Sequence, residues 1–346
     1  MILRLLLLLL HGYVAWRLAP ALGVVGGVAL VVALAASVLV MPFGLRARRS
    51  ASGGPAAALP WAALILMGLF SSLFVLTAGR DLLLLAVGIW HAAQPPALDP
   101  AAVETTSARA VLALTAAITA IGLVNARRTA AVVRVDVPIA GLNPAWDGFS
   151  IAQISDVHVG PTIRRPYLEA IVAAVNRLDA DIVAITGDLV DGSVSDLAEH
   201  VAPLAQLRSR HGTFFVTGNH EYYSGAAAWV RELRRLGAIV LMNQHVVLHR
   251  GDAALVIAGV TDFSAGHFDS AEASDPVRAL AGSPPAALRV LLAHQPRSAA
   301  AAEAAGVDLQ LSGHTHGGQF WPWNHLVRLQ QPFTAGLHRW KRMWVY

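Results

Sequence analysis

The sequence predicts an N-terminal α-helical transmembrane region followed by an α/β domain, and three observations lead to this division. The chain of 346 residues is 55% hydrophobic and only 14% charged, with a mean hydropathy of +0.53, which is too apolar for an ordinary soluble protein. Long apolar runs occupy the first 125 residues. From about residue 130, short β-rich runs alternate with helical stretches, which is typical of an α/β domain.

The membrane region, residues 1–128, contains four apolar runs at residues 2–16, 20–42, 60–92 and 108–125. A helix needs about 20 apolar residues to cross a bilayer, so we expect about four spanning helices rather than buried helices of a soluble domain. The first run is as short as the core of a signal peptide, but it lacks a convincing cleavage site and a second run follows at once. Arg80-Asp81 interrupts the third run, where we expect one spanning helix plus an interfacial segment.

The charges that flank these runs predict an orientation. Positive residues follow the second and fourth runs, at Arg46, Arg48, Arg49, Arg127 and Arg128. Asp99 and Glu104 lie between the third and fourth runs, and Arg17, between the first two, departs from the pattern. Because cytoplasmic loops carry an excess of Lys and Arg, we expect both termini and the C-terminal domain on the cytoplasmic side of a multi-pass membrane protein.

The distribution of charge also bears on partners. Residues 1–125 carry seven Arg against three acidic residues, whereas residues 126–346 carry 19 basic and 19 acidic residues. The net charge of +4 therefore comes from the membrane region, and the folded domain lacks the basic excess of a nucleic-acid binder. We expect the lipid bilayer as a partner and no nucleic acid. The chain has no cysteine, which excludes disulfides and thiolate metal ligands.

The domain at residues 130–346 is predicted to alternate strands and helices. Short β-rich runs that end in turn residues give the expected strands, at residues 151–154, 182–185, 214–216, 255–258, 290–292 and 309–311. The expected helices lie at residues 167–177, 197–208, 226–236 and 298–305.

Residues of metal-ligand type follow five of these strands. They are Asp156 and His158, Asp188 and Asp191, Asn219 and His220, His294, and finally His314 and His316. A lone His or Asp-x-His is more often an ordinary structural feature, but ligands in open α/β sheets gather at the carboxyl ends of strands. Imidazole and carboxylate ligands together suit Mn, Fe, Zn or Co, and Asp188 is the natural bridge between two ions because a carboxylate has two oxygens. The glycines before Asp188, Asn219 and His314 allow tight backbone turns.

This series of motifs resembles the calcineurin-like metallophosphoesterases. The matching motifs are Asp156-x-His158, Gly187-Asp188-x-x-Asp191, Gly218-Asn219-His220-Glu221, His294 and Gly313-His314-x-His316. The longer run from Gly313 to Gln319, GHTHGGQ, is similar to a membrane-attached bacterial subgroup of that family. The resemblance covers about residues 130–346, and it implies a sandwich of two β-sheets flanked by helices at the inner membrane.

The resemblance also implies a site with two divalent ions. One ion would be held by Asp156, His158, Asp188 and His316, and the other by Asp188, Asn219, His294 and His314. His220, oriented by Asp191, would not be a ligand but would protonate the leaving oxygen or stabilise transition-state charge, while a metal-bound hydroxide attacks phosphorus in line. The segment at residues 259–262 only approximates the family pattern. The resemblance implies a further strand-rich tail after Tyr346, so we expect a truncated C-terminus.

The resemblance favours hydrolysis of a phosphodiester or pyrophosphate bond, and membrane attachment favours a lipid-linked substrate. Phe320, Trp321 and Trp323 follow the last metal motif, and they are expected either to form an apolar wall for such a substrate or to serve as core packing or an interfacial anchor. A phosphomonoesterase or phosphoprotein phosphatase is the alternative function. A non-catalytic receptor or scaffold is the third hypothesis, and the intact ligand set argues against it.

Overall fold

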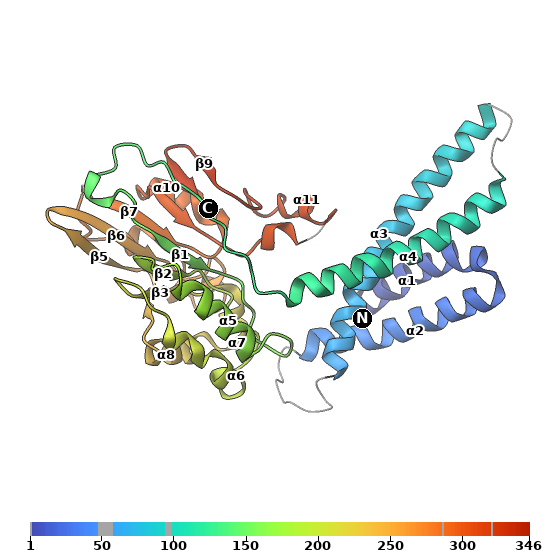
Figure 1. Ribbon diagram of the computed structural model, residues 1–346, viewed down its shortest axis with the longest axis horizontal. Helices are drawn as coiled ribbons and strands as arrows, with labels where there is room; N and C mark the ends of the chain where they lie inside the picture. Colours follow the sequence, from blue (N-terminus) through green and yellow to red (C-terminus); the bar gives the residue numbers. More distant parts are fainter. Residues whose placement is uncertain (1, 48–57, 94–98, 286, 320) are drawn as a thin grey trace. The chain divides into compact units, whose positions relative to one another are not determined.

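The structure is a computed structural model that describes residues 2–47, 58–93, 99–285, 287–319 and 321–346. It divides into an N-terminal unit that ends at Arg128 and a C-terminal unit, Thr129–Tyr346 (Figure 1). Each unit has its own hydrophobic core, and each is described here by itself.

The described part of the N-terminal unit consists of long apolar helices. They are α1 (Ile2–Leu18), the 3₁₀ turn η1 (Ala19–Leu22), α2 (Gly23–Ala47), α3 (Ala58–Ala93) and α4 (Pro100–Arg127). Three stretches are long and apolar enough to cross a membrane: Arg4–Phe43, Ala58–Ala92 and Pro100–Arg127. The first stretch contains both α1 and α2. The short turn η1 joins these helices, and Nε2 of His11 on α1 lies 3.2 Å from Oγ of Ser37 on α2.

The third apolar run differs from its expected division into a spanning helix and an interfacial segment. It forms the single continuous helix α3, because the charges of Arg80 and Asp81 are satisfied without a break in the helix. Arg80 is buried and donates hydrogen bonds to Oγ of Ser107 and to the backbone oxygens of Arg17 and Glu104. The Asp81 carboxylate accepts from the Arg17 guanidinium at 2.9 Å.

The fourth helix begins earlier than its expected start at residue 108. Asp99 is its N-cap and accepts a hydrogen bond from the backbone of Ala101, and Pro100 occupies the first helical position. Glu104 therefore lies inside α4 rather than in a connecting loop. Arg48 and Arg49, which contribute to the predicted orientation, lie outside the described residues.

The C-terminal unit contains two β-sheets. Strands β1 (Ile151–Ile154), β2 (Ile182–Ile185), β3 (Thr213–Phe215) and β4 (Ile239–Val240) form a parallel sheet in that order. The second sheet is mixed and has the order β5-β6-β7-β8-β10-β9. Its strands are β5 (Gln244–Arg250), β6 (Ala253–Gly259), β7 (Leu288–Leu292), β8 (Leu309–Leu311), β9 (His338–Trp340) and β10 (Met343–Val345).

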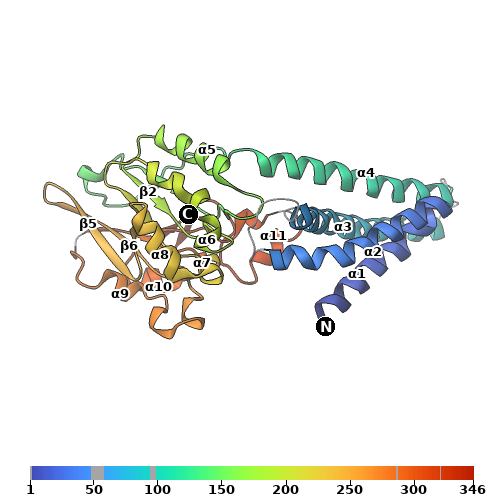
Figure 2. The ribbon, with the colours of Figure 1, turned by 90° about the horizontal axis from the view of Figure 1, so that it is seen from below.

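The two sheets pack face to face, as the family resemblance implies. One core cluster joins Phe214 and Val216 of the first sheet region to Leu255, Ile257 and Val290 of the second. Helices cover the outer faces of both sheets (Figures 1 and 2). The helices over the first sheet are α5 (Arg165–Asn176), α6 (Val194–Val201) and α8 (Ala226–Arg235), and those over the second are α9 (Pro276–Leu280) and α10 (Ala299–Ala304).

Six strands agree with the predicted strands to within a few residues. Strands β4, β5, β9 and β10 were not predicted, and neither were α7 (Asn219–Ser224), α9 and α11 (Asn324–Val327). Strand β10 pairs in parallel with β8, and Met343 and Val345 are buried. The last residues of the chain thus extend the second sheet rather than trailing from it.

Candidate active site

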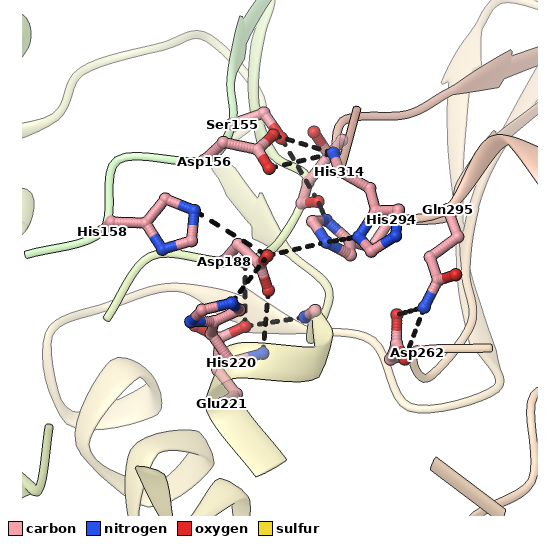
Figure 3. Close-up of polar contacts among 12 residues, drawn as sticks. Ser155, Asp156, His158, Asp188, His220, Glu221, Asp262, His294, Gln295 and His314 are labelled. Carbon is pink, nitrogen blue, oxygen red and sulfur yellow. Dashed lines mark hydrogen bonds and ion pairs between the residues drawn. The ribbon is translucent and has the colours of Figure 1, made fainter. Parts of the chain in front are cut away.

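The residues of metal-ligand type gather where five strands of the two sheets end. Strands β1, β2 and β3 of the first sheet lead to Asp156, Asp188 and Asn219, and β7 and β8 of the second sheet lead to His294 and His314. The side chains of His158, His220 and His294 surround the Asp188 carboxylate (Figure 3). The fold therefore assembles one polar cluster from segments up to 160 residues apart, from Asp156 to His316.

The backbone at these positions is unusual. Five residues of the cluster have positive φ angles, at Asp156, His158, Asp188, His314 and His316. The left-handed region is costly for residues with a Cβ atom, although Asp, Asn and His adopt it more readily than others. Such conformations persist only where the surrounding structure enforces them, and they concentrate at functional sites.

Two of the neighbouring glycines are required for different reasons. Gly187 has a φ of 90°, and a Cβ at this position would lie 2.6 Å from the backbone nitrogen of Gly218. Gly313 has an ordinary φ, but a Cβ there would collide with the side chains of Ser155 and Asp156. These glycines let the loops of the two sheets approach each other closely enough for their side chains to meet.

Asp156, His158 and His316 form a first group of potential ligands. Nε2 of His316 lies 3.3 Å from Oδ1 of Asp156 and 3.1 Å from Nε2 of His158. His316 is exposed, so this side of the cluster is open to solvent.

Asp188, His294 and His314 form a second, more deeply buried group. Nε2 of His294 lies 3.1 Å from Oδ2 of Asp188 and 3.3 Å from Nδ1 of His314. The same Asp188 oxygen is 3.9 Å from Nε2 of His158 in the first group. Asp188 therefore stands between the two groups, where a bridging ligand would have to be.

The residues present fit divalent metals on three grounds. Two ring nitrogens 3.1–3.3 Å apart have the spacing of two donors on one ion, since metal–nitrogen bonds are about 2.0–2.1 Å. Nδ1 of His294 donates to the backbone oxygen of Thr186 at 2.7 Å, so Nε2 is the nitrogen that faces the cluster and could bind an ion once it is deprotonated. Oδ1 of Asn219 is buried and makes no hydrogen bond, so a cation would satisfy it.

The charges in the buried group are strongly coupled. Burial opposes ionisation of Asp188, but the hydrogen bond and charge of His294 outweigh it and hold the pKa of Asp188 well below its usual range. Burial likewise disfavours the charged form of His294, and the Asp188 carboxylate reverses this effect and raises the pKa of His294 to about 9. Burial and the nearby charge of His294 lower the pKa of His314 to about 4.

Asp191 contacts two histidines rather than one. Its Oδ1 atom accepts a short hydrogen bond from Nδ1 of His220, and it also lies 3.3 Å from Nδ1 of His158. These two bonds outweigh the effect of burial and hold the pKa of Asp191 below its usual range. Nε2 of His220 is then left facing the cluster, 3.9 Å from Oδ2 of Asp188.

Glu221 is a site residue whose role the sequence analysis missed. Its fully buried carboxylate accepts hydrogen bonds from four backbone N–H groups, with distances of 2.7–3.3 Å, from Gly218, Asp188, Leu189 and Val190. It therefore fixes the loop after β2 against the loop after β3. Burial and the charge of Asp188 raise the pKa of Glu221 to about 7. The available signal was its place as the last residue of the Gly218-Asn219-His220-Glu221 motif.

A series of hydrogen bonds between buried side chains lies next to His294. Nε2 of Gln295 donates to both oxygens of Asp262 at 3.0 Å, and both residues are almost fully buried (Figure 3). Gln331 in turn donates to Oε1 of Gln295 at 3.1 Å. Asp262 belongs to the segment at residues 259–262, so that segment supports the position next to His294.

The three aromatic residues expected near the site differ in their exposure to solvent and in whether the structure describes them. The Trp321 side chain is 68% exposed, which rules out core packing for this residue. Trp323 is half-buried, and Phe320 lies outside the described residues. Whether these residues contact a substrate remains a proposal.

Comparison with known proteins shows which family the domain resembles. The calcineurin-like phosphoesterase family matches residues 149–318. A transmembrane protein with metallophosphoesterase domain from Bos taurus is 42% identical over 237 residues, which cover 65% of this chain and 53% of that protein. An uncharacterized metallophosphoesterase of Campylobacter jejuni is 37% identical over 215 residues, covering 62% of this chain and 55% of that protein. Among solved structures, Haemophilus influenzae NAD nucleotidase is 14% identical with a TM-score of 0.39, covering 57% of this chain and 44% of that chain.

The chain spans about half the length of the curated relatives it matches. The family match extends from the residues before β1 to Gly318, and it includes every residue of both ligand groups. The C-terminal unit therefore contains a calcineurin-like phosphoesterase domain, which matches that family over residues 149–318.

Proposed function

We propose that this protein is a membrane-attached hydrolase that uses two divalent metal ions to cleave a phosphodiester or pyrophosphate bond, in a lipid-linked substrate. The observation that carries the proposal is two adjacent groups of three His or Asp donors. They are Asp156, His158 and His316, and Asp188, His294 and His314. Mn, Fe, Zn and Co all suit such mixed imidazole and carboxylate donors.

Asp156, His158, Asp188 and His316 would hold one ion, and Asp188, Asn219, His294 and His314 the other. A pair of divalent ions activates water at neutral pH and neutralises charge on the phosphoryl oxygens. Asp191 holds Nδ1 of His220, so that Nε2 can carry the proton that the leaving oxygen requires. Glu221 keeps the loops of Asp188 and Asn219 in register, which fixes the spacing of the donors.

Two observations support a lipid-linked substrate. The N-terminal unit contains stretches long and apolar enough to cross a membrane, so the domain is tethered to a bilayer. Trp321 is exposed five residues after His316, where it could contact an acyl chain. The location that we propose is the inner membrane, with several spans, and the Arg residues beside the apolar runs favour the domain on the cytoplasmic side.

The test is an assay of the purified full chain with Mn²⁺ on a bis-aryl phosphate, an aryl phosphate and lipid diphosphates. We expect the diester and the lipid diphosphates to be cleaved faster than the monoester. Preference for the aryl phosphate would support a phosphomonoesterase or phosphoprotein phosphatase instead. No cleavage of any substrate by metal-loaded protein would support a receptor or scaffold.

Trp321→Ala tests the lipid component separately. It should weaken use of the lipid substrate several-fold or more, because burial of one large apolar side chain contributes about 1.5–3 kcal/mol, and should leave the soluble diester unaffected. Val277→Ala, which removes an exposed apolar side chain from α9, is the matched control. Equal losses on both substrates with Trp321→Ala would contradict a role in lipid binding.

A further inference from the structure

Three exposed apolar side chains, together called the ridge, lie on the segment that follows the last metal motif. The side chains of Trp321, Leu326 and Leu329 are 68%, 53% and 85% exposed, and Leu329 is among the most exposed large hydrophobic residues of the described chain. The segment forms turns around the short helix α11, Asn324–Val327. Such a concentration of exposed apolar groups marks a surface that contacts something other than water.

This ridge is mounted on a fixed base. At its far end, Gln331 is buried, donates to Oε1 of Gln295, and accepts from the backbone nitrogen of Arg297 at 3.0 Å. At its near end, Gly318 packs so closely against Asn324 that a Cβ would collide with it. The segment that carries the three apolar side chains is therefore anchored to the domain by buried contacts at both ends.

The charge around the ridge matches an anionic surface. Residues 309–346 contain no acidic residue, but they contain three Arg and one Lys, together with four of the nine Trp of the chain. Arg328 is exposed and lies between Leu326 and Leu329 in the sequence. Trp and Arg beside exposed Leu are the residues that favour the boundary between lipid headgroups and acyl chains.

The short tether between the two units limits how far the domain can lie from a bilayer that contains α4. Helix α4 ends at Arg127, and Pro138 is already fixed to the domain because its backbone oxygen accepts from Nε1 of Trp344 at 2.8 Å. The ten residues between them, 128–137, span at most about 33–36 Å when fully extended. A bilayer that contains α4 is thus always close to the domain, whereas any other partner would have to be recruited.

We propose that the Trp321/Leu326/Leu329 ridge docks the phosphoesterase domain onto the surface of an anionic bilayer. The three side chains enter the interface, and Arg328 contacts lipid phosphates. The ridge begins five residues after His316, and Gln331 beyond its far end donates a hydrogen bond to Gln295, the neighbour of His294. Docking therefore brings the candidate metal ligands close to the lipid headgroups. This docking of the domain on the bilayer does not depend on which bond is cleaved.

The test uses the full chain in vesicles of phosphatidylcholine with or without phosphatidylglycerol. The protein has no cysteine, so Leu329→Cys gives one site for an environment-sensitive fluorophore, and Asp252→Cys, in the exposed turn between β5 and β6, gives a matched control. Quenchers attached to the acyl chains should quench the label at residue 329 at least several-fold more than the label at residue 252. Leu326→Glu in the Leu329→Cys background should abolish that difference, and Arg328→Glu should reduce it only in the anionic vesicles.

Equal lipid quenching at the two positions would overturn the proposal. A label at residue 329 that is shielded from aqueous iodide but not quenched by lipid would also overturn it, and would favour a second copy of the chain or another protein on the ridge. Metal content is measured on each variant and should be unchanged, because none of the altered residues belongs to a ligand group. The readout is depth in the bilayer, so it is independent of hydrolytic activity.

Discussion

Nδ1 of His220 donates a hydrogen bond to Asp191, and this contact turns Nε2 of the same ring toward Asp188, at 3.9 Å from its Oδ2 atom. A histidine held in this way presents one defined nitrogen to the cluster, which is the requirement for proton transfer to a leaving oxygen. The third potential ligand group, His158, Asp191 and His220, contains the same contact, so a metal-binding role for His220 must be distinguished from a proton-transfer role.

His220→Ala makes that distinction. General acid–base catalysis typically contributes about 10²–10⁴-fold, so turnover should fall by a factor in that range while the metal content stays near wild type. Elemental analysis of the purified variant provides the second measurement. A variant that has lost an ion would show that His220 is a ligand.

Asp188→Asn should lower the metal content as well as the activity. Asp188 stands between the two ligand groups, so removal of its charge should weaken both sites and abolish activity. Asn tolerates the left-handed backbone at this position, which separates the effect of charge from backbone strain. Two ions per chain are expected in wild-type protein, and an active wild-type protein with one ion or none would contradict the two-metal proposal.

Glu221→Gln should destabilise the site without touching a ligand. Both carboxylate oxygens accept backbone N–H groups, and the amide NH₂ of Gln would face two donors instead. A buried donor left unsatisfied costs about 1–3 kcal/mol, so the thermal midpoint of the metal-free protein should drop and metal affinity should fall. Glu169→Gln, at an exposed ion pair with Arg165, is the control and should change neither quantity measurably. Wild-type stability in Glu221→Gln would show that the carboxylate does not hold these loops.

Metal binding should depend on pH through His294. The pKa of His294 in the metal-free protein is raised to about 9, so at pH 7 its Nε2 carries a proton that an ion must displace. Affinity should therefore rise between pH 7 and pH 9, by up to about tenfold per pH unit for one released proton. Calorimetry at pH 7 in two buffers of different ionisation enthalpy should detect that release. An affinity that is flat over this interval would mean that His294 is already neutral.

The predicted orientation can be tested with reporter fusions. The Arg residues after the second and fourth apolar runs favour a cytoplasmic phosphoesterase domain. A phosphatase reporter that is active only in the periplasm should be inactive when it is fused after residue 130, and a fusion at the loop between α3 and α4 should be active. Activity of the first fusion would reverse the orientation.

The ends of the main strands could be predicted because each has a strong local signal. Strands β1, β2 and β8 are short β-rich runs followed directly by polar turn residues, and their predicted bounds agree with the structure. Strand β5 was missed because only the middle of its sequence, QHVVLHR, is apolar. Strands β9 (HRW) and β10 (MWV) are as short as β8, but neither combines aliphatic residues with a polar turn directly after them, so they gave no comparable signal.

The relations within the site could be predicted only in part. Residue types and strand ends indicated which residues would meet, because the carboxyl ends of strands are where ligands gather. Three of the four donors to Glu221, on Asp188, Leu189 and Val190, lie about 30 residues away in the chain, and no local pattern connects them to it. The continuity of α3 was missed for a similar reason, since Arg80 is satisfied by groups on α1 and α4.

The left-handed turns at Asp156, His158, Asp188, His314 and His316 bear on how the sequence can change over time. Glycine adopts this backbone without steric cost, so replacement by glycine would relieve each turn as well as remove a donor. A lineage released from metal chemistry would drift toward such relaxed turns, because selection would then favour only the stability of the fold. This chain carries a carboxylate or an imidazole at all five turns, so at each of them a potential metal donor coincides with a costly backbone conformation.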